Sequence, residues 1–302
     1  MRIGALAFKR KQWEPFAFAS PSLALIALVI VFPLIYAFWL SLRNFDLSVG
    51  ADSDFIGFKN YTEALFRDKR FIGSVWNTAI IIVPSIILEL LLGLGLALLL
   101  SRVGRGRPII TALLAIPAMV SPVMAAMAWR MMFGVKYGAV NNLGRQLGLI
   151  DVYFDWFSSP FISIVAIVLV EVWHNTSFMM LVLLAGLQSI PQELYDAGKA
   201  DGADGWKSFW HITLPLLKFT MAVGIMIRTI DLTKLFGLIF VLTYGGPGGA
   251  TETMAFTTYL VGFNDMRMSY ASALSYVIVG SVVVLTLVFM WIQRYREMRA
   301  AA

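Results

Sequence analysis

Cysteine is absent from the 302-residue sequence, and histidine occurs only twice, as His174 and His211. These shortages exclude a disulfide framework, a thiol nucleophile and a cysteine-based metal site, and they argue against a multi-histidine metal site. Charge is also scarce, at 14% of residues, against about 25% in soluble globular proteins. Apolar residues make up 59% of the chain. This balance excludes both an ordinary cytoplasmic domain and a disordered chain.

Six long apolar runs account for most of the sequence. A helix needs about 20 mostly apolar residues to cross about 30 Å of hydrocarbon. Runs of sufficient length occur at about 21–42, 71–101, 108–132, 156–187, 219–243 and 268–293. They predict an all-α, polytopic membrane protein in which residues 1–302 form a single membrane domain with six transmembrane helices.

The distribution of Lys and Arg between the loops predicts the orientation of the chain. The loops on the side of the N-terminus carry 13 of these residues, and the loops on the opposite side carry eight. Since the more basic short loops stay in the cytoplasm, we expect both termini to be cytoplasmic. The net charge of +6 is then an orientation signal, and it does not indicate a nucleic-acid partner.

One polar loop, residues 188–218, has more structure than a connector needs. An acid, Glu193, suits the first turn of a short helix over 193–199, because the helix dipole favours negative charge there. Gly202 permits a sharp turn, and a second short helix is expected over 205–212. The loop therefore predicts two short helices near the cytoplasmic membrane surface.

The same loop carries the residues of a known motif. Asp196-Ala197-Gly198 is followed after three residues by Gly202, and after nine more by Ile212-x-Leu214-Pro215. This order resembles the EAA loop of the permease subunits of binding-protein-dependent ABC importers, with Asp196 in place of Glu and Gly198 in place of Ala. The resemblance implies a set of ATPase-coupling residues: Glu193, Tyr195, Asp196, Ala197, Gly198, Asp201 and Gly202.

Two further segments resemble the carbohydrate-uptake branch of that family. Leu242–Thr251 is similar to the Thr-x-Gly-Gly-Pro segment of MalF- and UgpA-like subunits, and Arg228–Phe236 is similar to a segment of trehalose- and maltose-type sugar permeases. The resemblance implies the ABC type I importer fold, a bacterial cytoplasmic (inner) membrane and a di-/oligosaccharide, polyol or related carbohydrate as solute. It also implies the partners, which are a second permease, two ATPase subunits and an extracytoplasmic solute-binding protein.

The sequence contains no nucleotide-binding or catalytic constellation. No G-x-x-x-x-G-K-[ST] occurs, so the chain cannot cradle phosphates with a P-loop. No set of side chains suits catalysis, and none suits a metal. The chain is therefore expected to be a transport subunit and not an enzyme, without a cofactor of its own. The resemblance assigns ATP and Mg²⁺ to the partner ATPase.

Polar residues inside the apolar runs are the candidates for a solute path, because charges at membrane depth usually face a bundle interior or a water-filled cavity. Trp173 suits stacking on a sugar ring, and Asn175 suits hydrogen bonding to hydroxyls. Arg228, Asp231 and Lys234 are spaced by three, so neighbours can pair on one helix. The other interpretation of these three residues is an ion-paired knot that only fixes helix packing.

A second function class is compatible with the same intramembrane acids. In an ion-coupled secondary transporter, Glu89, Glu171 and Asp231 would form a proton or sodium relay. The motif spacing in 188–218 discriminates between the classes, because a secondary carrier has no ATPase to bind. Under the importer interpretation, Glu89 is expected to bond to a neighbouring helix.

Overall fold

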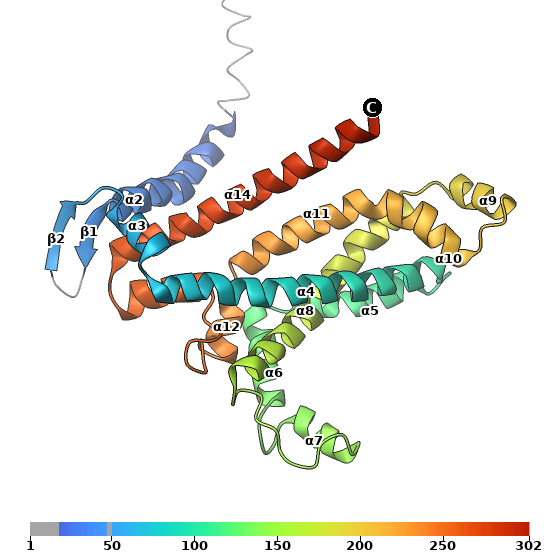
Figure 1. Ribbon diagram of the computed structural model, residues 1–302, viewed down its shortest axis with the longest axis horizontal. Helices are drawn as coiled ribbons and strands as arrows, with labels where there is room; N and C mark the ends of the chain where they lie inside the picture. Colours follow the sequence, from blue (N-terminus) through green and yellow to red (C-terminus); the bar gives the residue numbers. More distant parts are fainter. Residues whose placement is uncertain (1–17, 47–49, 302) are drawn as a thin grey trace, which may run out of the picture. The chain divides into compact units, whose positions relative to one another are not determined.

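The computed structural model describes residues 18–46 and 50–301, in which the chain forms two units that are described separately below. Unit 1 combines the chain up to Asp68 with Thr258–Val277. Unit 2 is formed by the remainder. Helices make up most of both units (Figure 1), which follows from the long apolar runs and the scarcity of alternating polar and apolar residues.

The first elements in chain order cover the first three apolar runs and the segments that follow each of them. An apolar helix covers Phe18–Ser41 and contains a π-helical turn, η1. The elements up to the fourth run are η1 (Ala27–Val31), α2 (Phe32–Ser41), β1 (Arg43–Asp46), β2 (Gly50–Phe55), α3 (Lys59–Phe66), α4 (Lys69–Arg102), α5 (Arg107–Met119), α6 (Pro122–Met132) and α7 (Ala139–Gln146).

The remaining elements contain the fourth, fifth and sixth apolar runs and the loop between the fourth and fifth. They are α8 (Pro160–Gln188), α9 (Gln192–Ala200), α10 (Gly205–Ser208), η2 (Phe209–Thr213), α11 (Leu214–Thr233), α12 (Gly237–Leu242), α13 (Met254–Tyr259), η3 (Leu260–Asn264) and α14 (Met268–Ala301).

Polar side chains connect the hairpin of unit 1 to its helices. β1 pairs with β2 in an antiparallel hairpin. The Asn60 amide donates to the carbonyls of Ser41 at 2.8 Å and Arg43 at 3.0 Å. The backbone N–H of Phe45 donates to Ser269 Oγ at 2.8 Å. These bonds give backbone groups at the helix–strand junction side-chain partners.

Glycines allow the central helices of unit 2 to approach closely. A Cβ at Gly93 of α4 would lie 3.0 Å from Met179 Cβ and from the Met180 backbone nitrogen of α8. A Cβ at Gly224 of α11 would lie 2.9 Å from Met179 Sδ. Because small residues let backbones come together where lipid offers no hydrophobic driving force, these glycines set the spacing of α4, α8 and α11.

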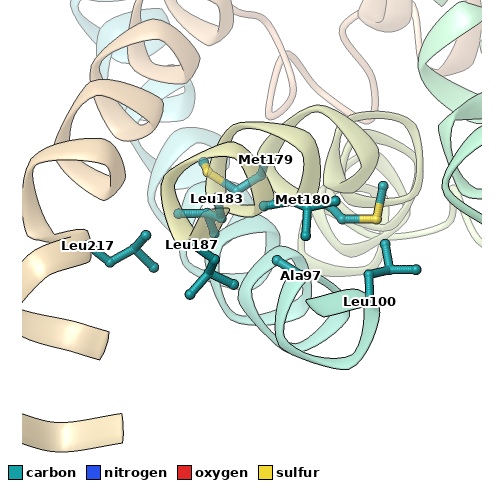
Figure 2. Close-up of a cluster of buried hydrophobic side chains, with 8 residues drawn as sticks. Ala97, Leu100, Met179, Met180, Leu183, Leu187 and Leu217 are labelled. Carbon is teal, nitrogen blue, oxygen red and sulfur yellow. The ribbon is translucent and has the colours of Figure 1, made fainter. Parts of the chain in front are cut away.

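An apolar cluster lies next to these glycines. Figure 2 shows Ala97 and Leu100 of α4 beside α8, while Leu217 of α11 points toward Leu187 of α8. The full cluster of buried residues is Ala97, Leu100, Met179, Met180, Leu183, Leu184, Leu187 and Leu217. This packing holds together the three helices that carry the charged residues of the candidate site.

The apolar run at 108–132 forms two helices and not one continuous span. α5 and α6 meet at a bend of 88°. Pro117 removes a backbone donor near the end of α5. Ser121 precedes Pro122 and adopts an extended ψ of 137°, as the proline ring favours. The described residues contain five helices long and apolar enough to span a membrane, or six if this bent pair counts as one span.

The run at 219–243 also divides. The helix begins earlier than expected, because α10, η2 and α11 form one continuous helix over Gly205–Thr233. The helix ends at Thr233, and α12 follows as a separate short helix. The carbonyl of Leu235, which lies in the break, accepts a hydrogen bond from Thr253 Oγ1 at 2.6 Å. A side chain thus supplies the donor that a continuous helix would have provided.

Candidate functional site

Arg228 of α11 joins two carboxylates inside unit 2. Its Nε and Nη2 donate to Glu89 of α4 at 2.7 and 3.0 Å, and Nη2 also donates to Glu171 Oε1 of α8 at 2.5 Å. The exposed fractions are 0% for Glu89, 4% for Arg228 and 5% for Glu171. We call Glu89, Glu171 and Arg228 the charge triad. It connects three helices, and it confirms the expectation that Glu89 bonds to a neighbouring helix.

The geometry of the triad suits strong pairing. An arginine that contacts both oxygens of a carboxylate forms two parallel charge-assisted bonds. A buried charge costs several kcal/mol unless it is paired and hydrogen-bonded. With all three groups charged, two carboxylates face one guanidinium, so the arrangement depends on Arg228 more than on either acid alone.

Asp231 of α11 and Lys234, which follows the last residue of that helix, are exposed in this chain. Asp231 Oδ2 lies 3.8 Å from Arg228 Nη1, and Asp231 Oδ1 lies 3.6 Å from Lys234 Nζ. The expected pairing at i, i+3 is therefore confirmed. The Asp231 and Lys234 side chains are 49% and 59% exposed, against 4% for Arg228. The structure thus separates one buried, fully engaged charge from two that are accessible.

Residues of α8 extend the triad. The Asn175 amide donates to Glu171 Oε1 at 2.8 Å and to His174 Nδ1 at 3.1 Å. Trp173 is 39% exposed and packs edge-on against Trp129 of α6, with ring centroids 5.6 Å apart. The structure therefore brings Asn175 into contact with the triad, while Trp173 contacts α6.

The loop between α8 and α11 contains the first predicted short helix as α9, but the second, expected over 205–212, is the beginning of a continuous helix that covers Gly205–Thr233. Gly202, between α9 and α10, has a φ of +80°, which a residue with a Cβ rarely adopts. Asp204 caps α10 by accepting from the Lys207 N–H at 2.7 Å. The Tyr195 hydroxyl bonds to Thr213 Oγ1 at 3.0 Å and ties α9 to η2.

Most of the predicted coupling residues in this loop are exposed in this chain. Of the predicted coupling residues, Tyr195 and Gly198 are half-buried, whereas Glu193, Asp196, Ala197, Asp201 and Gly202 are exposed. α9, α10 and η2 enclose an open concavity of about 450 Å³. A Cβ at Gly198 would lie 2.9 Å from Ile212 Cδ1, so alanine at this position would require the end of the Ile212 side chain to move. The concavity and the exposed acids suit a protein partner.

The segment that resembles Thr-x-Gly-Gly-Pro is held by side chains. Thr251 Oγ1 donates to the Gly246 carbonyl and lies at hydrogen-bond distance from Thr243 Oγ1, each at 2.8 Å. Arg70 donates to both carboxylate oxygens of Glu252 at 2.8 and 3.0 Å. These bonds order a glycine-rich segment whose composition alone would favour many conformations.

Two contacts between α8 and the third apolar run were not predicted from the sequence. The Ser177 hydroxyl donates to the Leu114 carbonyl at 2.5 Å, and His174 Nε2 lies 2.8 Å from the Val120 carbonyl. The prolines of the third run give no signal for these two acceptors, because Pro117 and Pro122 would remove the donors to the carbonyls of residues 113 and 118 in a continuous helix. The two contacts depend on how α8 packs against this run, which no local pattern indicates.

Comparison with known proteins gives concordant matches. Residues 89–301 match the family model described as binding-protein-dependent transport system inner membrane component. The chain is 38% identical over 280 residues to the trehalose/maltose transport system permease protein MalF of Thermococcus litoralis, covering 92% of each chain.

Solved structures match over nearly the whole chain. A bacterial ABC transporter involved in the import of the acidic polysaccharide alginate aligns with a TM-score of 0.82 at 23% identity, covering 96% of this chain and 98% of that chain. The alginate transporter in complex with alginate pentasaccharide-bound periplasmic protein aligns with a TM-score of 0.78 at 23% identity, covering 93% of each chain. At these identities the likeness shows the fold, which is that of an ABC importer permease.

Proposed function

Because this chain belongs to the family of binding-protein-dependent transport system inner membrane components, we propose that it imports a carbohydrate together with a second permease subunit. The solute class is a di- or oligosaccharide, a polyol or a related carbohydrate. The observation that carries this class is the 38% identity to a trehalose/maltose permease over 92% of both chains. The chain is a multi-span inner membrane transport component and not an enzyme.

The α9–α10 loop is the coupling element in this proposal. Its exposed acids and concavity receive a separate ATPase subunit, which binds ATP and Mg²⁺, and a second ATPase serves the partner permease. A solute-binding protein delivers the sugar from outside, and the solved complex of the alginate transporter with an alginate pentasaccharide-bound periplasmic protein supports this role. In this proposal, residues 1–302 form one membrane domain of six spans with both termini in the cytoplasm.

The solute path is proposed to follow the polar residues of α8 and α11. Trp173 and Asp231 offer an accessible ring face and an accessible carboxylate, and Lys234 adds a donor. Asn175 and Arg228 reach the same region from the buried side. The ion-coupled alternative has no support from the comparisons with known proteins, and two of its three acids are engaged by Arg228.

The coupling proposal is tested by Gly202→Val, with Gly205→Ala as the matched control. Valine at φ +80° strains the turn by about 1–3 kcal/mol, whereas a Cβ at Gly205 meets nothing within 4 Å. We expect Gly202→Val to leave the subunit inserted but to uncouple ATP hydrolysis from uptake. The measurements are sugar uptake and binding-protein-stimulated ATPase activity of the reconstituted complex. Normal coupling in Gly202→Val would make the loop an ordinary connector.

The path proposal is tested by Asp231→Asn and Trp173→Ala. Both side chains are accessible, so neither change leaves a buried charge unpaired. We expect lower uptake with normal assembly and normal basal ATPase activity. If both variants transport at the rate of the unmodified chain, the path does not include these residues.

A further inference from the structure

Two backbone carbonyls beside the bend between α5 and α6 accept hydrogen bonds from another helix. Val120, the last residue before the bend, has an extended ψ of 138°, so its carbonyl leaves the helical ladder. In a membrane, backbone groups freed by a helix break must find partners within the protein. Two partners for the carbonyls beside the bend come from α8.

His174 and Ser177 are those partners. They are three residues apart and share one face of α8. Ser177 Oγ donates to the Leu114 carbonyl at 2.5 Å, and His174 Nε2 lies 2.8 Å from the Val120 carbonyl. α8 is thereby attached to α5 on both sides of Pro117.

The hydrogen bonds around His174 define its tautomer. The Val120 carbonyl can only accept, so His174 Nε2 carries the proton. The Asn175 amide nitrogen donates to the Glu171 carboxylate and to His174 Nδ1, so Nδ1 is the unprotonated nitrogen. A chain of hydrogen bonds therefore joins Arg228, Glu171, Asn175 and His174 to the bend, with Glu171 accepting from both Arg228 and Asn175.

We propose that His174 and Ser177 are positioning residues that fix the α5–α6 bend, and that the charge triad sets the position of His174 through Asn175. The bend in turn orients α6, whose Trp129 packs against Trp173. A change in the triad would thus alter the shape of the region around Trp173. Only the transport consequence rests on the proposed function, because the geometric claim is independent of the solute.

The experiment measures the geometry of the bend directly. Spin labels on cysteines at Met119 of α5 and Met131 of α6 report the distance across it by pulsed electron paramagnetic resonance. Both positions are exposed, at 81% and 79%, and the chain has no other cysteine. The test variants are His174→Phe and Ser177→Ala, measured in the full-length chain within its complex in lipid vesicles.

Two further variants keep the test specific. His174→Gln retains a side-chain N–H donor and should restore the distance. Thr176→Val is the matched control, since Thr176 is also buried but its hydroxyl donates to the Val172 carbonyl of its own helix at 2.6 Å. We expect one narrow distance population in the unmodified chain, in His174→Gln and in Thr176→Val. We expect loss of that population in His174→Phe and Ser177→Ala.

Three results would overturn the proposal. They are an unchanged distribution in both His174→Phe and Ser177→Ala, an equal loss in Thr176→Val, and failure of His174→Gln to restore the distance. Uptake provides a second readout, which should fall roughly five- to tenfold in His174→Phe, as expected for one lost buried hydrogen bond. If His174→Phe and Ser177→Ala lose the distance population but the unmodified chain transports no carbohydrate, the positioning role stands and the proposed solute class is rejected.

Discussion

Replacing Arg228 by methionine tests how strongly unit 2 depends on one guanidinium. The substitution keeps an unbranched apolar stem but removes three bonds of 2.7, 3.0 and 2.5 Å to Glu89 and Glu171. Two carboxylates, at 0% and 5% exposure, then lose their cationic partner. Breaking a buried pair by removing one member costs about 3–5 kcal/mol, and here both acids are affected.

The acids should behave differently from the arginine. Glu89→Met leaves Arg228 paired with Glu171, so the remaining charges balance, and the cost should be about 1–3 kcal/mol. In the double variant, Arg228→Met with Glu89→Met, one unpaired carboxylate is replaced by an apolar side chain. The double variant should therefore be more stable than Arg228→Met alone, which is strong non-additivity between residues in contact.

A double-mutant cycle measures this non-additivity. The four chains are unfolded reversibly with SDS in mixed micelles, and helix content is followed by circular dichroism. The reasoning is refuted if Arg228→Met costs less than about 1 kcal/mol, the upper range for an exposed ion pair. It is equally refuted if the effects of the two single substitutions simply add, because the acids would then be stable without the guanidinium.

Two other predictions concern packing and topology. Gly93→Leu should destabilise unit 2 by about 1–3 kcal/mol through overpacking, because even a Cβ at this position meets Met179 at 3.0 Å. Gly95→Leu is the control, since a Cβ there has nothing within 4 Å, and it should change stability by less than about 0.5 kcal/mol. The same SDS titration measures both variants, and equal effects would contradict the packing argument. A single cysteine at Tyr137, which is 93% exposed, should react with an impermeant thiol reagent on intact cells, and one at Lys199 should not; labelling at position 199 would reverse the proposed orientation.

The elements that the sequence predicts well are those specified locally. A long apolar run needs no tertiary information to be recognised, and α4 and α8 begin and end within a few residues of the expected runs. The turn at Gly202 also follows from a local property, its tolerance of positive φ, and the structure has it at +80°. The short helix before it, α9, was expected for the same kind of reason, whereas the continuation of the second helix from Gly205 to Thr233 was not.

The elements that escaped prediction depend on the fold. Glu89, Glu171 and Arg228 stand far apart in the chain, and nothing local indicates that one guanidinium contacts both acids. The division of 108–132 into α5 and α6 had a local signal in Pro117 and Pro122, but hydropathy is uniform across both prolines. Hydropathy measures how apolar a segment is and carries no information on backbone donors, which is why it missed the bend.

The position of Met179 between two glycines has a genetic consequence. Gly93 and Gly224 belong to different helices, yet the same thioether side chain fills the space beside both. The two glycines nevertheless face different parts of α8, since a Cβ at Gly224 would meet the Met179 sulfur, while one at Gly93 would also meet the Met180 backbone nitrogen. A bulkier substitution at Gly224 is therefore expected to be suppressed by a shorter residue at 179, whereas one at Gly93 is not. Suppressors of changes at Gly224 should thus recur at the codon for residue 179, and suppressors of changes at Gly93 should be absent from it.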